Sequence, residues 1–167
     1  DKPVGVRMLG QDFVLFRDSD GNAHCLSNTC THRSAGLADG VVSGDCVQCP
    51  YHGWQFNGDG KCTRIPSLGL DAKIPTRTRV DSYPTDERYG LIFAFLGDLP
   101  EEERPPIMEC KEYGQEGWRP TTIVFEWDID YKRSLENALD PAHNEFVHTT
   151  HIDKQENNPF QIPDLEL

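Results

Sequence analysis

Four residues with metal-binding side chains lie in two short segments of the chain. Cys30 and His32 are separated by one residue and Cys49 and His52 by two, with 16 residues between the two pairs. Thiolate and imidazole ligands together suit zinc or iron–sulfur chemistry. Zinc fingers usually take both cysteines from one loop and both histidines from another. Here each segment offers one of each, which favours a [2Fe–2S] centre with two cysteines on one iron and two histidines on the other.

The residues around these pairs are similar to a known family signature. The segments CTHR, from Cys30, and CPYHGW, from Cys49, resemble the signature of Rieske [2Fe–2S] domains. The resemblance extends from about residue 5 to 96. It implies an all-β fold with the cluster held by loops at its tip, and it implies Cys30, His32, Cys49 and His52 as ligands. A zinc-stabilised interaction module is the alternative for the same residue types.

Three positions separate the chain from the Rieske proteins of respiratory complexes. Those proteins carry a further cysteine in each loop, joined as a disulfide, and a serine that donates to a bridging sulfide. Ala35 or its neighbours and Tyr51 stand in the cysteine positions here, and Trp54 replaces the serine. With fewer donors to the sulfurs, we expect a potential near the low end of the Rieske range, about −150 mV. Such a centre suits electrons that come from NAD(P)H through a reductase.

A second set of candidate ligands, Asp140, His143 and His148, follows about a hundred residues later. At about 100° per residue, Asp140 and His143 would share one face of a helix. His148 would then require a break, which we expect from Pro141 and from a local change after His143. Two histidines and a carboxylate are the ligand set of non-haem Fe(II) oxygenases. The spacing therefore predicts a mononuclear iron site.

The segment from residue 127 to 151 resembles the iron-binding segment of Rieske non-haem iron oxygenases, in their terminal oxygenase (alpha) component. The resemblance implies His143 and His148 as iron ligands. It implies Asp140 as a bridge from His52 to His143, made between neighbouring subunits of a homotrimer. The third iron ligand would lie beyond the last residue, so we expect a chain truncated at both ends. The compact spacing favours the monooxygenase and demethylase branch.

The pattern along the chain predicts one domain and the beginning of another. Short strands separated by turns such as DSDG and GDGK predict an all-β Rieske domain over residues 1–97, with a central strand at 89–97. Residues 98–117 are acidic and proline-rich and predict a linker. Residues 118–167 read as the N-terminal part of a catalytic domain of the α+β, helix-grip-like class. It would open with a strand over 121–131, followed by a helix.

Composition limits the classes of partner. The formal net charge of −12 argues against nucleic acid as a partner. No apolar run approaches the roughly 18 residues of a spanning helix, so we expect no membrane span in this sequence. We interpret Cys25, Cys46 and Cys62 as small strand residues and leave Cys110 unassigned. A reducing, cytoplasmic compartment fits the cysteines best, and any targeting peptide would lie upstream.

These observations lead to one principal hypothesis and one alternative. The principal hypothesis is a terminal oxygenase that takes electrons through a reductase, a ferredoxin or both. The Rieske cluster would pass them to a mononuclear Fe(II), which activates O2 to hydroxylate or oxidatively demethylate a small organic substrate, aromatic or cyclic. The alternative is a Rieske ferredoxin-like electron carrier without a second iron site.

Overall fold

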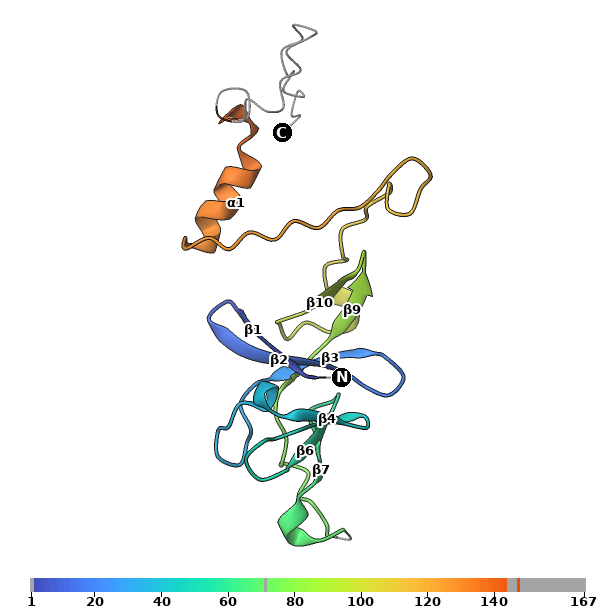
Figure 1. Cartoon of the computed structure of the whole chain (residues 1–167), viewed down its shortest axis with the longest axis vertical. Coiled ribbons are helices and arrows are strands. Elements are labelled where there is room, and N and C mark those ends of the chain that lie inside the picture. The colour runs from blue at the N-terminus through green and yellow to red at the C-terminus, as the bar shows by residue number, and fades with distance from the viewer. Residues whose placement is uncertain (1, 71, 144–146, 148–167) are drawn as a thin grey trace, which may run out of the picture. The chain divides into compact units, whose positions relative to one another are not determined.

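The computed structural model describes residues 2–70, 72–143 and 147 (Figure 1). The chain separates into two compact units, Asp1–Trp118 and Arg119–Leu167. Within the described residues, all strands belong to the first unit and form three antiparallel sheets. The helices in the same residues are too short or too polar to cross a lipid bilayer. The all-β class expected for the first part of the chain is confirmed.

The first sheet contains the hairpin that the sequence predicts. Its strands are β1 (Val4–Met8), β2 (Gln11–Arg17), β3 (Ala23–Ser27) and β8 (Ser82–Tyr83), in that order. In the β2–β3 register, Leu15 lies opposite Cys25 and Phe16 opposite His24. The Phe13 ring meets the Tyr83 ring edge to face at 5.0 Å, a favoured geometry for an aromatic pair.

The second sheet carries the loops of interest. Its strands are β4 (Val41–Ser43), β5 (Cys46–Gln48), β6 (Gln55–Asn57) and β7 (Cys62–Arg64), in sequence order. Two 3-10 turns accompany it, η1 (Leu37–Asp39) and η2 (Pro66–Leu68). The first cysteine–histidine pair lies between β3 and η1, and the second lies between β5 and β6. The second pair therefore occupies a turn between two strands that are hydrogen-bonded to each other, whereas the first pair lies in the connection from the first sheet to the second.

One hydrophobic core joins the two four-stranded sheets and includes both candidate cysteine ligands. Its buried members are Val14, Phe16, Leu26, Cys30, Leu37, Val47, Cys49, Phe56, Cys62, Ile65 and Val80. Cys25 and Cys62 are buried strand residues as expected, whereas Cys46 is only half-buried and Cys110 is exposed. All six cysteines are free thiols. The ligand-bearing loops thus begin at residues that the core already fixes.

A close backbone approach at Gly40 places β4 beside the end of β5. A Cβ on residue 40 would lie only 1.9 Å from the carbonyl oxygen of Gln48. Gly40 also donates its N–H to the carbonyl of Leu37 at 3.0 Å, so its backbone has little room to shift. Because Gln48 directly precedes Cys49, this contact helps to set where the second loop begins.

The third sheet is a two-stranded hairpin of β9 (Thr85–Arg88) and β10 (Leu91–Ala94). The expected central strand at 89–97 is therefore wrong, since β10 is shorter and pairs with β9 alone within the described residues. An apolar run signals burial, but its side chains here are only half-buried or exposed. A bidentate ion pair between Arg17 and Glu87, at 2.6 and 2.7 Å, connects the hairpin to β2. Beyond it lies η3 (Glu101–Glu103).

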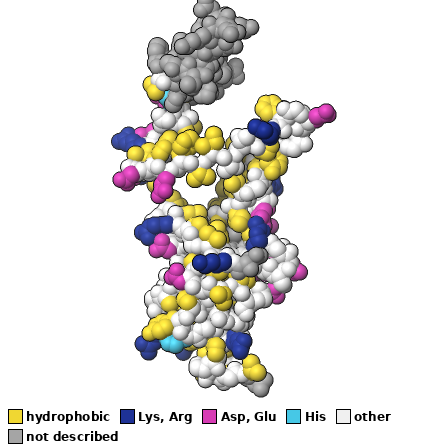
Figure 2. Space-filling view, in the orientation of Figure 1, with side chains coloured by type: hydrophobic (Ala, Val, Ile, Leu, Met, Phe, Trp, Pro, Cys, Tyr) yellow, Lys and Arg dark blue, Asp and Glu magenta, His cyan; other side chains and the backbone are white. Residues whose placement is uncertain are grey.

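The described part of the second unit contains α1 (Tyr131–Leu139) and the 3-10 turn η4 (Pro141–His143). Asp130 caps α1 by accepting the N–H of Lys132 at 2.9 Å. The strand expected over 121–131 is not formed, since within the described residues no strand is assigned there and no strand pairing includes this segment. Instead, this segment and α1 carry several hydrophobic side chains that are exposed to solvent (Figure 2).

The helix break expected from Pro141 is confirmed, and it separates Asp140 from His143. Asp140 ends α1 with φ −104° and ψ 91°, because the residue before a proline is pushed out of the α region. The expectation that Asp140 and His143 share one helix face is therefore wrong. The further change expected after His143 falls on residues outside those that the structure describes.

Asp18 organises the turn between β2 and β3. Its Oδ1 accepts the backbone N–H groups of Asp20 at 3.0 Å and Asn22 at 2.9 Å. Its Oδ2 accepts from the Asn22 amide at 3.1 Å and lies 2.9 Å from His24 Nε2. The hydrogen bond with His24, followed by those from Asn22, lowers the pKa of Asp18 from 3.8 to about 2.

We predict that Gly40→Ala destabilises the first unit. The new methyl group meets the Gln48 carbonyl, and overpacking of this kind costs about 1–3 kcal/mol. Thermal unfolding of the purified chain measures the loss. Val41→Ala, at an exposed neighbouring position, is the matched control and should unfold close to the wild type. Equal stability of Gly40→Ala and wild type would contradict the contact.

The lowered pKa of Asp18 gives a pH dependence of stability with a definite sign. The ionised carboxylate stabilises the fold above the unfolded pKa near 3.8, and this contribution is lost as the pH falls towards about 2. Asp18→Asn should therefore be less stable than the wild type at neutral pH and lose less stability between pH 4 and 2. Melting temperatures across this range test it, with the exposed Asp59→Asn as control. Parallel pH profiles for wild type and Asp18→Asn would refute the assignment.

Candidate metal centre

The first loop closes back on its own cysteine through two backbone hydrogen bonds. The N–H of Cys30 donates to the carbonyl of Ala35 at 2.9 Å, and the carbonyl of Cys30 accepts the N–H of Ser34 at 2.8 Å. Ser34 adopts a left-handed backbone with φ of 57°. The turn thus fixes both the N–H and the carbonyl of Cys30, and it places His32 at the exposed end of the loop.

The second loop repeats the same pattern at the same spacings. The N–H of Cys49 donates to the carbonyl of Trp54 at 2.8 Å, and the carbonyl of Cys49 accepts the N–H of Gly53 at 3.1 Å. Gly53 occupies the same place in this loop as Ser34 in the first, and it also has a positive φ, here 71°. Glycine adopts this conformation without strain. The two loops are therefore the same turn built twice.

The two thiols lie inside the core. Cys30 is 1% exposed and Cys49 is 2% exposed, and both belong to the same hydrophobic core. Burial raises the pKa of Cys30 to about 11, and the neighbouring Cys49 thiol adds to the rise. A thiol in such surroundings ionises when a metal binds it, because a coordinating thiol is deprotonated outright.

The two imidazoles lie at the outer ends of the loops and are exposed to solvent. The rings of His32 and His52 are 4.5 Å apart between centroids and inclined at 65°. The Trp54 indole stacks on His32 at 4.4 Å and 3°, and Tyr51 contacts His52 at 3.9 Å and 38°. The pKa of His32 lies below its ordinary value, first through desolvation and then through the nearby His52 and Arg33.

The donor set fits a two-iron cluster with a buried and an exposed side. Two thiols lie together in the core and two imidazoles lie together at the surface, as cysteines on one iron and histidines on the other require. Across residues 2–70, 72–143 and 147, no three His, Cys, Asp or Glu side chains are grouped to hold a single ion. This is compatible with a Rieske centre, in which each iron has only two protein ligands.

The second candidate set is described only in part. Asp140 is exposed, and its Oδ1 accepts the N–H of Ala142 at 3.1 Å. His143 follows in η4 and is half-buried. His148 lies outside the described residues, so the expected iron site is not assembled among them. Asp140 and His143 belong to the second unit and are described apart from the cluster loops.

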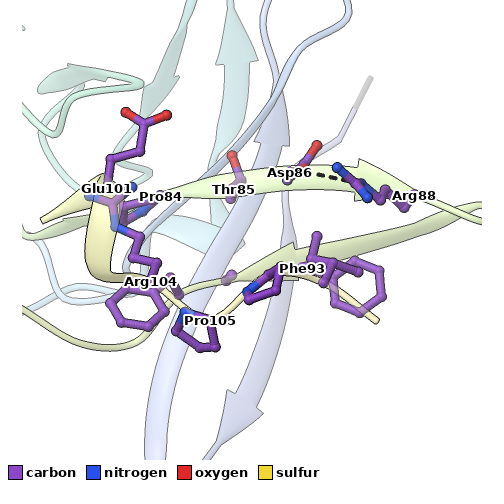
Figure 3. Close-up of a pocket in the computed structure, with 12 residues that line it drawn as sticks. Pro84, Thr85, Asp86, Arg88, Phe93, Glu101, Arg104 and Pro105 are labelled. Atoms are coloured by element: carbon purple, nitrogen blue, oxygen red, sulfur yellow. Dashed lines mark ion pairs between the residues drawn. The ribbon is translucent and has the colours of Figure 1, made fainter. Parts of the chain in front are cut away.

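A pocket of about 520 Å³ lies beside the β9–β10 hairpin (Figure 3). Its wall includes Phe93 and Phe95, and the Arg104 guanidinium lies 5.6 Å from the centroid of the Phe95 ring. Arg88, also in the wall, pairs with Asp86 at 3.4 Å. None of the four candidate cluster ligands lines this pocket, so it is separate from the metal centre.

The sequence singled out the four candidate donors, but it did not predict the contact of Trp54 with His32. The available signal was the aromatic residue two positions after His52, which the sequence analysis used only as the replacement of a serine. Stacking across two loops depends on how the loops pack, and the spacing of residues along the chain does not report it.

Comparison with known proteins agrees with this geometry. The Rieske [2Fe-2S] domain family matches residues 1–84. The toluene-4-sulfonate monooxygenase system iron-sulfur subunit TsaM1 of Comamonas testosteroni is 36% identical over 143 residues, covering 86% of this chain and 40% of that protein. The 5,5'-dehydrodivanillate O-demethylase oxygenase subunit of Sphingobium sp. is 31% identical over 146 residues, covering 86% and 34%. Protein TIC 55, chloroplastic, of Pisum sativum is 33% identical over 148 residues, covering 89% and 27%.

Solved structures give the same result. NdmA of Pseudomonas putida CBB5, solved with caffeine, superposes with a TM-score of 0.74 at 31% identity, over 88% of this chain and 42% of that one. Dicamba monooxygenase bound to dicamba gives 0.73 at 31% identity, over 88% and 43%. The chain spans between 22% and 40% of the length of the curated relatives it matches. Its two matching turns, its donor set and these similarities show that the chain belongs to the Rieske [2Fe–2S] domain family, among relatives that include oxygenase subunits.

Proposed function

We propose that this chain is part of the terminal oxygenase component of a Rieske non-haem iron oxygenase. The observation that carries the proposal is the pair of equivalent turns, which brings two buried thiols and two exposed imidazoles together. In this proposal Cys30 and Cys49 hold the inner iron of the cluster, and His32 and His52 hold the outer one. Relatives named as a monooxygenase subunit and as a demethylase oxygenase subunit support the reading.

The buried cysteines and the exposed histidines would have different roles. The buried cysteines exclude water from one side of the cluster, while the exposed histidines give electrons a way in and out at the surface. When bound, the cluster supplies one-electron transfer and a mononuclear Fe(II) supplies dioxygen activation. His143 and His148 would hold that iron, and Asp140 would hydrogen-bond both His143 and a neighbouring subunit's copy of His52. This last role requires an oligomer, for which we propose a homotrimer.

The partners follow from the same proposal. Electrons would come from NAD(P)H through a reductase, a ferredoxin or both, in a reducing compartment such as the cytoplasm. The substrate would be a small aromatic or cyclic organic molecule that is hydroxylated or oxidatively demethylated. The named relatives TsaM1 and dehydrodivanillate O-demethylase favour these two outcomes.

We predict about three irons per chain in the whole gene product purified without oxygen, two in the cluster and one mononuclear. Cys49→Ser should lower this to about one and remove the visible absorption of the cluster. Cys46→Ser is the matched control, because Cys46 lies on the preceding strand and bonds only to the Thr63 hydroxyl at 3.3 Å. It should keep all the iron. About two irons in a wild-type preparation that shows no loss of iron would favour the electron-carrier alternative.

We predict that Asp140→Asn keeps both metal centres but lowers turnover by about a hundredfold or more, comparable with losses from misplacing a catalytic group. The amide keeps the size of the side chain and its contact with Ala142, yet it loses the charge that would join two imidazoles. Single-turnover product formation with a chemically reduced cluster measures the effect. Asp130→Asn, at the other end of α1, serves as control. Normal turnover in Asp140→Asn would sink the bridging role.

A further inference from the structure

The two exposed imidazoles of the metal centre have very different neighbours. Trp54 lies flat against His32, with 4.4 Å between the ring centroids and only 3° between the planes. His52 meets His32 and Tyr51 at inclined angles of 65° and 38°. Tyr51 itself is 62% exposed. One imidazole thus has a parallel aromatic surface on one side, and the other has only tilted contacts.

The Trp54 indole is held in place by the hydrophobic core, whereas Tyr51 is exposed to solvent. Trp54 is half-buried and packs against the hydrophobic core, together with Val42 and Ile74. Its carbonyl accepts the N–H of Cys49 at 2.8 Å, which ties its backbone to the turn of the second loop. The indole therefore has a fixed position, set by the core on one side and by the Cys49 turn on the other.

The stack connects the two loops. Trp54 belongs to the second loop, whereas His32 belongs to the first. The torsion that turns an imidazole about its Cβ–Cγ bond has broad minima and little preference of its own. A flat indole at contact distance removes most of that freedom and also covers one face of the ring from water. Ligand orientation and solvent exposure are two of the factors by which a protein tunes an iron–sulfur centre.

We propose that Trp54 is a positioning residue of the cluster, which fixes the plane of the His32 imidazole while His52 has no equivalent support. The inference rests on the proposed function, since it assumes that His32 binds iron. It makes the two nitrogen ligands inequivalent through the protein around them. It also gives the position occupied by serine in respiratory Rieske proteins a different task here: an aromatic ring that acts on the ligand instead of a hydroxyl that acts on a sulfide.

The test is nitrogen hyperfine spectroscopy of the reduced whole protein, in which the two ligating imidazoles give two sets of couplings. Trp54→Leu should broaden or shift one set and leave the other unchanged. Trp54→Phe keeps an aromatic face and should restore the wild-type spectrum. We also expect the cluster of Trp54→Leu to be lost about fivefold faster on warming than that of Trp54→Phe, from the usual strength of an aromatic pair.

Two controls separate positioning from simple structural damage. Val42→Ala trims a side chain that lies on β4, outside both loops, and packs against the same core as Trp54, so it should lower the melting temperature and leave both sets of couplings unchanged. Tyr51→Leu removes the exposed neighbour of His52 and should also leave them unchanged. If Trp54→Leu assembles no cluster, Trp54→Met, whose unbranched and flexible side chain fills irregular gaps better, carries the same comparison with Trp54→Phe.

The outcomes distinguish this inference from the proposed function. A wild-type protein without a Rieske spectrum would overturn both. A wild-type Rieske spectrum that Trp54→Leu reproduces, with both nitrogen sets unchanged, would overturn the positioning role alone. A change confined to one set in Trp54→Leu, restored in Trp54→Phe and absent in Val42→Ala, would establish it.

Discussion

The burial of two cysteine thiols in one core is the constraint on which the geometry of the candidate metal centre depends. Cys30 and Cys49 come from loops far apart in the sequence, and both are fully enclosed by the core. Each backbone is held by the same pair of hydrogen bonds, to the fourth and fifth residues that follow. Because the histidines come two and three residues after the cysteines, they are carried out to the surface. Burial of the thiols and exposure of the imidazoles are therefore one consequence of one repeated turn.

Features set by nearby residues were predictable from the sequence. The β2–β3 hairpin follows from a turn at Asp18–Gly21 between two apolar runs, and the structure confirms it. The segments that carry the four donors were recognisable because each donor pair is local and its residue types are unusual. Cys25 and Cys62 are buried in strands, as expected. In each case the information lies within about ten residues, where turn chemistry and alternation act directly.

Features that depend on distant contacts were not predictable. The apolar run at 91–96 signals a buried strand, yet only β9 pairs with β10 in the described residues and neither strand is buried. The alternation over 121–131 satisfies the pattern of a strand, but a strand also needs a hydrogen-bonded neighbour, and no pairing of this segment occurs in the described residues. The stack of Trp54 on His32 joins two loops that a linear pattern treats separately. In all three the residue types were seen and the partners were not.

The two candidate metal-binding regions obtain their geometry in different ways. In the first unit, the core and the two turns hold the cluster loops. In the second, Val124, Phe125 and Trp127 are 86%, 69% and 54% exposed, which is a large apolar surface for water to cover. The backbone of Asp140 is an exception, because Pro141 alone excludes it from the helix. The local turn that presents Asp140 is thus set by two adjacent residues, whereas the cluster loops owe their geometry to a shared core.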